Sequence, residues 1–211
     1  MGPMSDSTAS HYFTTPRDEE RRTRIPVLLR GRQLTVETSG GIFSPRGLDK
    51  GTAVLLEEAP DPVGTELLDL GCGWGPLTIA LAHCAEPGAR VTAVDVNERS
   101  LGLTRDNAAG AGAGAVEALL PEQVPTDRRF DTIWSNPPIR IGKDALHELL
   151  LLWLPRLDQD GTAWLVVQKN LGADTLQSWL QQALPDHTEG PWRVRRATTA
   201  KGFRVLTVHR G

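Results

Sequence analysis

Cysteine is scarce in this sequence. Only Cys72 and Cys84 occur among 211 residues, and neither belongs to a CxxC pair. The five histidines are scattered along the chain, so nothing completes a set of zinc ligands. We therefore expect no metal site and two reduced cysteines that contribute to packing.

Long apolar runs are also missing. No stretch approaches the roughly 20 apolar residues that a membrane-spanning helix needs, and residues 1–22 contain no apolar segment like that of a signal peptide. These absences predict a cytoplasmic protein. Residues 1–10 should be disordered, and residues 11–211 should form a single domain, with a hairpin and a helix in 11–58 and the core of the fold in 59–211.

Net charge is small, at −3, but it is unevenly distributed. Residues 1–50 carry 8 basic and 6 acidic side chains, residues 51–127 carry 3 and 12, and residues 128–211 carry 12 and 8. A nucleic acid would therefore have to contact the two ends of the chain and not its acidic middle. The simpler interpretation, which charge alone favours, is that these are ordinary solvated surfaces.

Strand-like and helix-like segments alternate along most of the chain. The spacing of apolar residues predicts helices over 75–85, 97–112, 144–157 and 172–184. Apolar runs bounded by turn residues predict two short strands within 27–44 and further strands over 66–70, 90–96, 115–120, 130–135, 161–168, 192–198 and 203–210. This alternation is typical of an α/β fold whose mostly parallel sheet has helices on both faces, here after an N-terminal β-hairpin. The last two strands lie too close in sequence for a crossover helix, so they must pair antiparallel.

The segment LDLGCGWGPL, residues 68–77, places three glycines at alternate positions between a predicted strand and a predicted helix. A dinucleotide-binding loop needs glycines at the first, third and sixth places. Counting from Gly71, the sixth place is Pro76, so the loop is not of that type. A ligand with a zwitterionic amino-acid end needs backbone amides for its carboxylate and an acid, here Asp69, for its ammonium group. The loop therefore predicts a site for S-adenosylmethionine (SAM).

Asp95 ends the next predicted strand, in VTAVDVN. A carboxylate at that place can accept hydrogen bonds from both hydroxyls of a ribose. Sites for NAD share this feature, so Asp95 is not specific by itself, but its combination with Asp69 and the three glycines is. The alternative is a glycine-rich turn and a strand-end aspartate without functional consequence.

A second motif, SNPPIR, follows the predicted strand 130–135. Ligands of open α/β sheets bind at the carboxyl ends of strands, so this turn should face the same cleft as the glycine loop. The side-chain oxygen of Asn136 and the carbonyl of Pro137 can each accept one N–H of an acceptor amine, which directs its nitrogen toward a methyl group. Pro137 and Pro138 hold these carbonyls in place, and Ile139 would pack on the flat face of the acceptor. The alternative is that Pro-Pro is only a stiff turn.

Nearly the whole sequence resembles the RsmC/RlmG-type ribosomal RNA guanine-N2 methyltransferases, in a short single-domain form. The resemblance is carried by the two motifs above and by HYFT (11–14), VETSGGIFSPRGLDKGTAVLLE (36–57), FDTIWSNPPIRIGKDALHELL (130–150) and KGFRVLTV (201–208). It implies a class I methyltransferase fold, with a seven-stranded mostly parallel sheet and a terminal antiparallel strand. It also implies SAM as methyl donor, S-adenosylhomocysteine as product, and ribosomal RNA or a ribosomal subunit as partner.

Motifs and resemblance together give the candidate site residues. The catalytic candidates are Asn136, Pro137, Pro138 and Ile139, with Asn136 and its turn binding the guanine amine. The cofactor-binding candidates are Asp69, Gly71, Cys72, Gly73, Gly75, Asp95, Val96, Asn97, Leu119 and Asn136. Leu119 stands about where such enzymes often carry an acidic residue for the adenine amine, so adenine would be recognised by backbone groups or by Glu122.

The substrate side is expected to combine a cleft floor with basic residues. The resemblance suggests that Phe43, Ser44, Gly47, Asp49 and Gly51 build the floor. The candidate substrate contacts are Phe43, Ser44, Arg140, Lys143, Lys201 and Arg204, with Arg17, Arg21, Arg22 and Arg24 as further candidates for phosphate groups. Arg140 and Lys143 directly follow the catalytic turn, which favours a contact for these two.

Three other functions stay open. Release-factor methyltransferases act on a glutamine amide, but their sites usually read NPPY where this chain has Ile139 followed by RIGK. A small-molecule amine is another acceptor. A SAM-binding module without catalysis would have no chemical need for the Asn136 turn, although the departure at Leu119 keeps this alternative open. Longer family members carry an extra N-terminal domain that this sequence lacks, so the methylated nucleotide stays undetermined.

Overall fold

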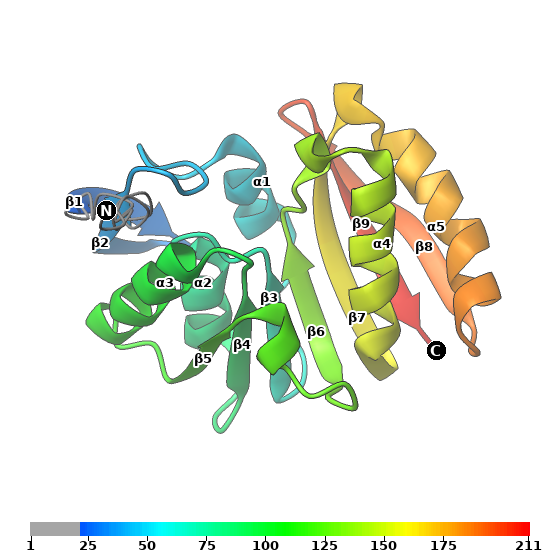
Figure 1. Ribbon diagram of the computed structural model, residues 1–211, viewed down its shortest axis with the longest axis horizontal. Helices are drawn as coiled ribbons and strands as arrows, with labels where there is room; N and C mark the ends of the chain where they lie inside the picture. The colour runs from blue at the N-terminus through cyan, green and yellow to red at the C-terminus, as the bar shows by residue number, and fades with distance from the viewer. Residues whose placement is uncertain (1–21) are drawn as a thin grey trace, which may run out of the picture.

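A single seven-stranded sheet forms the centre of the computed structural model, which describes residues 22–211 (Figure 1). Its strands are β3 (Glu66–Leu70), β4 (Arg90–Val94), β5 (Ala115–Leu119), β6 (Phe130–Ser135), β7 (Leu157–Gln168), β8 (Trp192–Ala200) and β9 (Phe203–Arg210). They lie in the order β5-β4-β3-β6-β7-β9-β8, and β9 runs antiparallel to both of its neighbours while the other pairs are parallel. The predicted fold class is therefore confirmed, and the last strand of the chain lies between β7 and β8.

Helices cover both faces of the sheet. The helices α1 (Lys50–Glu58), α2 (Pro76–Cys84) and α3 (Glu98–Gly110) pack on one face, and α4 (Lys143–Trp153) and α5 (Ala173–His187) pack on the other. Successive strand residues point to opposite faces. Leu67 and Trp134 accordingly join the apolar cluster under α1 to α3, whereas Leu68 and Ile133 join the cluster under α4 and α5. The burial of both faces explains the nearly continuous apolar runs of the central strands.

Local sequence explains where several elements begin. Asn97 caps α3 by accepting a hydrogen bond from the Arg99 N–H (3.0 Å), as predicted. The helix α2 starts with Pro76 in its first turn, as predicted. The strand β7 starts at Leu157 and not at Gly161, because Leu157 pairs with Phe130 across an irregularity in the β6–β7 register. Pairing with a neighbouring strand here overrides the turn-like sequence DQDG.

A hairpin made of β1 (Arg22–Leu29) and β2 (Arg32–Ser39) precedes the sheet. Arg30 and Gly31 both have positive φ, 47° and 81°, as a type I′ turn requires. The Arg30 guanidinium anchors the hairpin: it donates to the Ala59 carbonyl (3.1 Å), pairs with Asp61 (2.9 Å) and lies 5.5 Å from the centre of the Trp134 ring. The hairpin therefore attaches to α1 and to the face of the sheet that α1 covers.

Some predictions fall on residues 1–21, outside the described part of the chain. These are the disorder of residues 1–10, the HYFT segment, and the phosphate contacts by Arg17 and Arg21. The division at residues 58 and 59 stays a prediction. Between Arg22 and Gly211, no helix is long and apolar enough to cross a membrane, and no group of three or more His, Cys, Asp or Glu side chains could hold a metal ion.

Replacement of Arg30 by alanine should destabilise the fold by about 1–3 kcal/mol, because two hydrogen-bonding partners and a ring contact are lost together. Urea denaturation of the two proteins measures the difference. Arg32→Ala is the matched control, since Arg32 is an exposed arginine beside the same turn. Equal midpoints for the Arg30 variant and the wild type would show that the anchor contributes nothing.

Candidate active site

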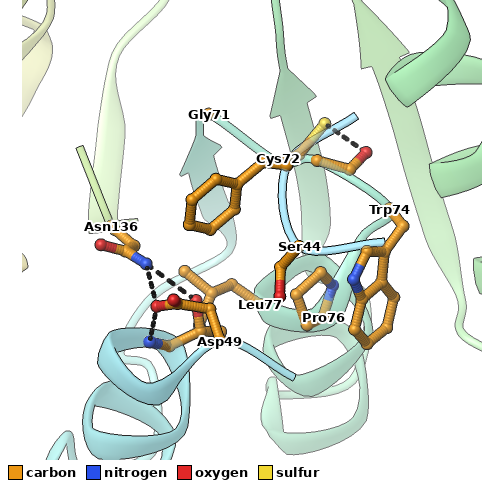
Figure 2. A pocket seen from close by; sticks show the side chains of 11 residues that line it. Ser44, Asp49, Gly71, Cys72, Trp74, Pro76, Leu77 and Asn136 are labelled. Carbon is orange, nitrogen blue, oxygen red and sulfur yellow. Dashed lines mark hydrogen bonds between the residues drawn. The ribbon is translucent and has the colours of Figure 1, made fainter. Parts of the chain in front are cut away.

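Three connections meet at the carboxyl ends of β3 and β6: the glycine loop (71–75), the turn after β6 (136–138) and the segment before α1 (40–49). They line one hollow together, with Ser44, Asp49, Trp74 and Asn136 among its side chains (Figure 2). The two sequence motifs therefore face the same cleft, as predicted from the topology of open α/β sheets.

Hydrogen bonds donated by its own backbone N–H groups hold the glycine loop in place. The N–H groups of Gly71 and Cys72 donate to the Val94 carbonyl (2.8 and 3.0 Å), that of Gly73 donates to Asp95 Oδ2 (3.0 Å), and that of Gly75 donates to the Cys72 carbonyl (2.9 Å). These four amides are therefore already used within the protein, and the predicted contact of backbone amides with a ligand carboxylate stays a prediction. Gly71 and Gly73 have positive φ (82° and 58°), and a Cβ added at either would meet no atom within 4 Å. The glycines thus let a ligand approach the backbone closely.

Asp69 is completely buried below this loop. Thr78 of α2 donates a 2.6 Å hydrogen bond to Oδ2, whereas Oδ1 has no hydrogen-bond partner in residues 22–211. Burial raises the pKa of Asp69 to about 7, and the Thr78 hydrogen bond opposes that shift. Asp69 does not line the hollow, so direct contact with a ligand ammonium is not supported. Its unpartnered oxygen fits a cation bound nearby, because a positive charge would stabilise the ionised form.

Asp95 joins the glycine loop to the start of α3. Its two carboxylate oxygens accept from the N–H groups of Gly73 (3.0 Å) and Asn97 (2.9 Å). Each oxygen keeps the capacity for a further hydrogen bond, so the ribose contact stays a prediction.

Val96, the residue after Asp95, is 81% exposed and offers an apolar surface at this edge. Asn97 caps α3 with its oxygen and donates its Nδ2 to the Gly41 carbonyl (3.2 Å), so its side chain has a structural role, and its contact with the cofactor stays a prediction.

The side chain of Asn136 is held in one orientation. Its Nδ2 donates to Asp49 Oδ2 (2.9 Å) and to Thr52 Oγ1 (3.0 Å) (Figure 2). A carboxylate can only accept hydrogen bonds, so the amide nitrogen must face Asp49 and the amide oxygen must point away from it. Asp49 is the N-cap of α1, and its Oδ2 also accepts from the N–H groups of Gly51 (2.8 Å) and Thr52 (3.2 Å). The start of α1 thus leaves Asn136 Oδ1 available to accept from a substrate.

The two prolines form a tight turn. Pro138 has φ −75° and ψ 74°, and the Ile139 N–H donates to the Pro137 carbonyl (2.8 Å), which together make an inverse γ-turn. The Pro137 carbonyl is held in place, as predicted, but one of its two lone pairs is already used. Ile139 packs partly against the apolar cluster under α4. Part of its side chain stays accessible, so the prediction that it packs on the face of the acceptor stays a prediction.

Comparison with known proteins agrees with this geometry. The methyltransferase small domain family matches residues 33–206. The YbxB protein of Bacillus subtilis (strain 168), itself uncharacterized, is 30% identical over 179 residues, which cover 82% of this chain and 89% of the relative. The chain belongs to the methyltransferase small domain family. The predicted class of enzyme, its family and its cofactor SAM are thereby confirmed.

Other relatives of this methyltransferase carry more specific names. The ribosomal RNA small subunit methyltransferase C (RsmC) of Shewanella loihica is 33% identical over 146 residues, which cover 69% of this chain and 38% of the relative. The 16S rRNA N2 methyltransferase RsmC of Thermus thermophilus, solved in complex with AdoMet and guanosine, is 25% identical with a TM-score of 0.71. That match covers 90% of this chain and 51% of the other. The methyltransferase thus spans about two fifths to half the length of these two relatives.

The predicted substrate residues differ in accessibility. Phe43 is 59% exposed where it lines the hollow, and Arg140 and Lys143 are exposed just after the Asn136 turn. The Ser44 hydroxyl donates to the Gly47 carbonyl (2.7 Å), and this bond shapes the segment before α1. These positions are compatible with substrate contact.

Two other basic candidates are paired. Arg204 is buried and forms an ion pair with Asp174 of α5, so the prediction that it contacts a phosphate is not supported. Lys201 is exposed and pairs with Glu57 of α1 (2.6 Å). Among the arginines of β1, Arg22 and Arg24 both pair with Glu37 of β2 (3.2 and 3.1 Å).

Leu119 ends β5, where it pairs with Val94 at the end of β4 just before Asp95, and is half-buried. The next residue, Leu120, precedes a short 3-10 helix, Pro121–Gln123, and donates its N–H to Gln123 Oε1 (2.8 Å). Glu122 lies in this helix and is exposed. Recognition of adenine by backbone groups or by Glu122 stays a prediction.

Sequence reasoning missed Thr52 and gave Asp49 only a place in the cleft floor. The sequence does carry a signal for Asp49 as a helix cap, because an acid directly precedes KGTAVLLE. That this cap also holds an amide 87 residues further along the chain follows only from the tertiary structure.

The affinity for SAM should depend on pH through Asp69. Below pH 7 the buried carboxyl is protonated and cannot balance a cation, so binding must be accompanied by loss of a proton. Affinity should therefore rise about tenfold from pH 6 to pH 8 and level off above pH 7. Calorimetry in two buffers of different ionisation enthalpy measures both the affinity and the released proton. Asp69→Asn should remove the dependence, and an unchanged pH profile in that variant would contradict the assignment.

Replacement of Asp49 by asparagine should lower the rate of methyl transfer about ten- to a hundredfold, because a neutral amide no longer compels the Asn136 nitrogen to face α1. Asparagine caps helices as well as aspartate does, so α1 should keep its start. Steady-state kinetics gives the rate, and SAM affinity should stay within a few-fold. Thr52→Ser, which keeps the hydroxyl, should be close to the wild type while Thr52→Val is slower. A full rate for both Asp49→Asn and Thr52→Val would show that the amide needs no such support.

Proposed function

We propose that this SAM-dependent methyltransferase transfers a methyl group to the exocyclic N2 amine of a guanine in ribosomal RNA. The proposal rests on the side-chain amide of Asn136. Two hydrogen bonds hold it in one orientation, with its oxygen available to a substrate beside the glycine loop of the cofactor site. Kinship with methyltransferases named for small-subunit ribosomal RNA supports the substrate class.

The residues present fit a cationic adenosyl cofactor. Gly71 and Gly73 leave the backbone open to close approach, Val96 gives an exposed apolar surface, and the second oxygen of Asp69 has no protein partner. When bound, SAM supplies a methyl group made electrophilic by its sulfonium. Asp69 would balance that charge from below the loop, and Asp95 would hold the ribose hydroxyls.

The acceptor is a weak nucleophile because its lone pair is delocalised into the base. Asn136 Oδ1 and the remaining lone pair of the Pro137 carbonyl would each accept one N–H of the amine. These two bonds aim the nitrogen lone pair at the methyl carbon and stabilise the positive charge that develops as the N–C bond forms and the S–C bond breaks. The extra proton then leaves to solvent, so no side-chain base is required.

A guanine amine inside a duplex is out of reach of such a site. The base would have to be flipped out or lie in a single-stranded region. The partner is therefore RNA in an accessible form, either free ribosomal RNA or an assembled subunit, and the reaction would take place in the cytoplasm.

A glutamine amide of a protein is the second candidate acceptor. It presents the same planar NH2 group, and the locked Asn136 oxygen suits it equally well. Ile139 in place of tyrosine, and the names of the relatives, favour RNA.

Incubation with methyl-labelled SAM and four separate pools distinguishes these acceptors: total RNA, 30S subunits, 50S subunits and soluble protein. Label should enter RNA, and nuclease digestion should release it as N2-methylguanosine. Asn136→Ala should lower incorporation at least a hundredfold while SAM affinity stays within a few-fold. Label that enters protein and not RNA would make the glutamine amide the favoured acceptor in place of guanine. Equal loss of transfer and of SAM affinity in Asn136→Ala would show that Asn136 is a structural residue.

A further inference from the structure

All four lysines of this sequence lie at the carboxyl end of the sheet. Lys50 and Lys143 are the first residues of α1 and α4, Lys169 directly follows β7, and Lys201 lies in the turn between β8 and β9. Figure 1 shows these segments together at the top of the view. The 19 arginines are spread over the chain, and several serve in ion pairs such as Arg30–Asp61 and Arg128–Glu66. Lysine is thus confined to the end of the molecule that holds the active site.

Three of these lysines line a second hollow beside the active site. It has a volume of about 540 Å³ and is lined by Lys50, Lys169 and Lys201, by the side chains of Gln168 and Asn170, and by the ring of Phe203. Ser44 and Asp49 line both hollows, so the two adjoin. The strand order β3-β6-β7-β9 places the glycine loop on one side of Asn136 and the second hollow on the other.

The backbone holds two of the lysines next to each other. The N–H of Lys169 donates to the Gly202 carbonyl (2.9 Å), which fastens the end of β7 to the β8–β9 turn. Lys201 and Gly202 have positive φ (50° and 83°), as a type I′ turn requires, so the position of the turn is well defined. The wall that carries Lys169 and Lys201 is therefore part of the sheet and not a free loop.

The charges in this hollow are mostly positive. Asp49 is the single acid of its lining, and its Oδ2 already accepts from Asn136 and from two N–H groups of α1. Glu57 neutralises Lys201. Lys50 and Lys169 are exposed, and neither has a carboxylate partner among the residues from 22 onward. Two ammonium groups are therefore available to an anion.

We infer that this hollow binds the phosphodiester backbone of RNA next to the guanine whose amine reaches Asn136. The inference rests on the proposed function and adds a phosphate subsite to it. Ammonium groups bind phosphates as compact point charges, the half-buried ring of Phe203 offers a surface for a sugar or base, and the amides of Gln168 and Asn170 can bond to the ribose. A polynucleotide that inserts one base beside SAM would lay its backbone across these groups.

The double variant Lys50→Ala/Lys169→Ala tests this subsite. The KM for ribosomal RNA should rise about tenfold at 0.15 M salt, and activity should recover as RNA approaches saturation. The slope of log KM against log salt should fall by roughly 1.4–1.8, the value for two phosphate contacts. SAM affinity, measured by calorimetry, should not change and will show that the cofactor site remains folded.

Two matched variants separate position from charge. Lys50→Arg/Lys169→Arg keeps both charges and should keep the salt slope of the wild type. Arg193→Ala removes an exposed cation from β8, roughly 20 Å from the β8–β9 turn, and should have little effect. A rise in KM no larger than that of Arg193→Ala, or an unchanged salt slope, would overturn the inference.

The small number of lysines allows a direct second measurement. Acylation with an amine-reactive reagent, followed by mass spectrometry, reports on four side chains one by one. RNA should protect Lys50 and Lys169, and SAM alone should protect neither. Methylation of RNA by the wild type without protection of these lysines would refute the subsite and leave the proposed function standing. No methylation of RNA by the wild type would refute the proposed function, and the subsite with it.

Discussion

The hydrogen bonds from the Asn136 amide nitrogen to Asp49 and Thr52 are the contacts on which the proposed chemistry of this site depends. An asparagine amide has a donor end and an acceptor end of nearly equal size, so without a partner it could present either one. A carboxylate decides between them because it accepts only. The same carboxylate caps α1, so the orientation of the Asn136 amide is coupled to the start of a helix that packs on the central strands. The site is therefore supported by the core and not by its own loop alone.

The Asn136 turn divides the carboxyl end of the sheet into two sides with different electrostatics. The cofactor side holds a buried acid, Asp69, under a loop of glycines, which suits a cation that must approach the backbone. The other side holds lysines around an open hollow, which suits an anion. A cationic methyl donor and a polyanionic acceptor are thus expected from opposite sides of one amide.

Sequence patterns predicted most elements within a few residues, because apolar periodicity and glycine or proline boundaries are local properties. The exceptions have non-local causes: β7 begins early because Leu157 pairs with β6, and β1 includes the residues before Val27 because Arg22 to Pro26 pair with β2. In the site, the cofactor loop and the Asn136 turn were recognisable from short motifs. The use of the loop amides, the burial of Arg204 and the packing of Ile139 were not, because each depends on a partner distant in sequence or on the depth of the side chain in the fold.

The sequence by itself determined the class of fold, the family and the pairing of a SAM loop with an Asn-Pro-Pro turn, since these follow from periodicity and from residues adjacent along the chain. Only the tertiary structure decided which end of the Asn136 amide is presented, that Asp69 is buried beneath the loop with one oxygen unpartnered, and that three lysines from separate segments surround one hollow. The physical reason is the same in each case. Hydrogen-bond direction, burial and the summation of charge depend on distances in space, and these distances join residues up to 151 positions apart, such as Lys50 and Lys201.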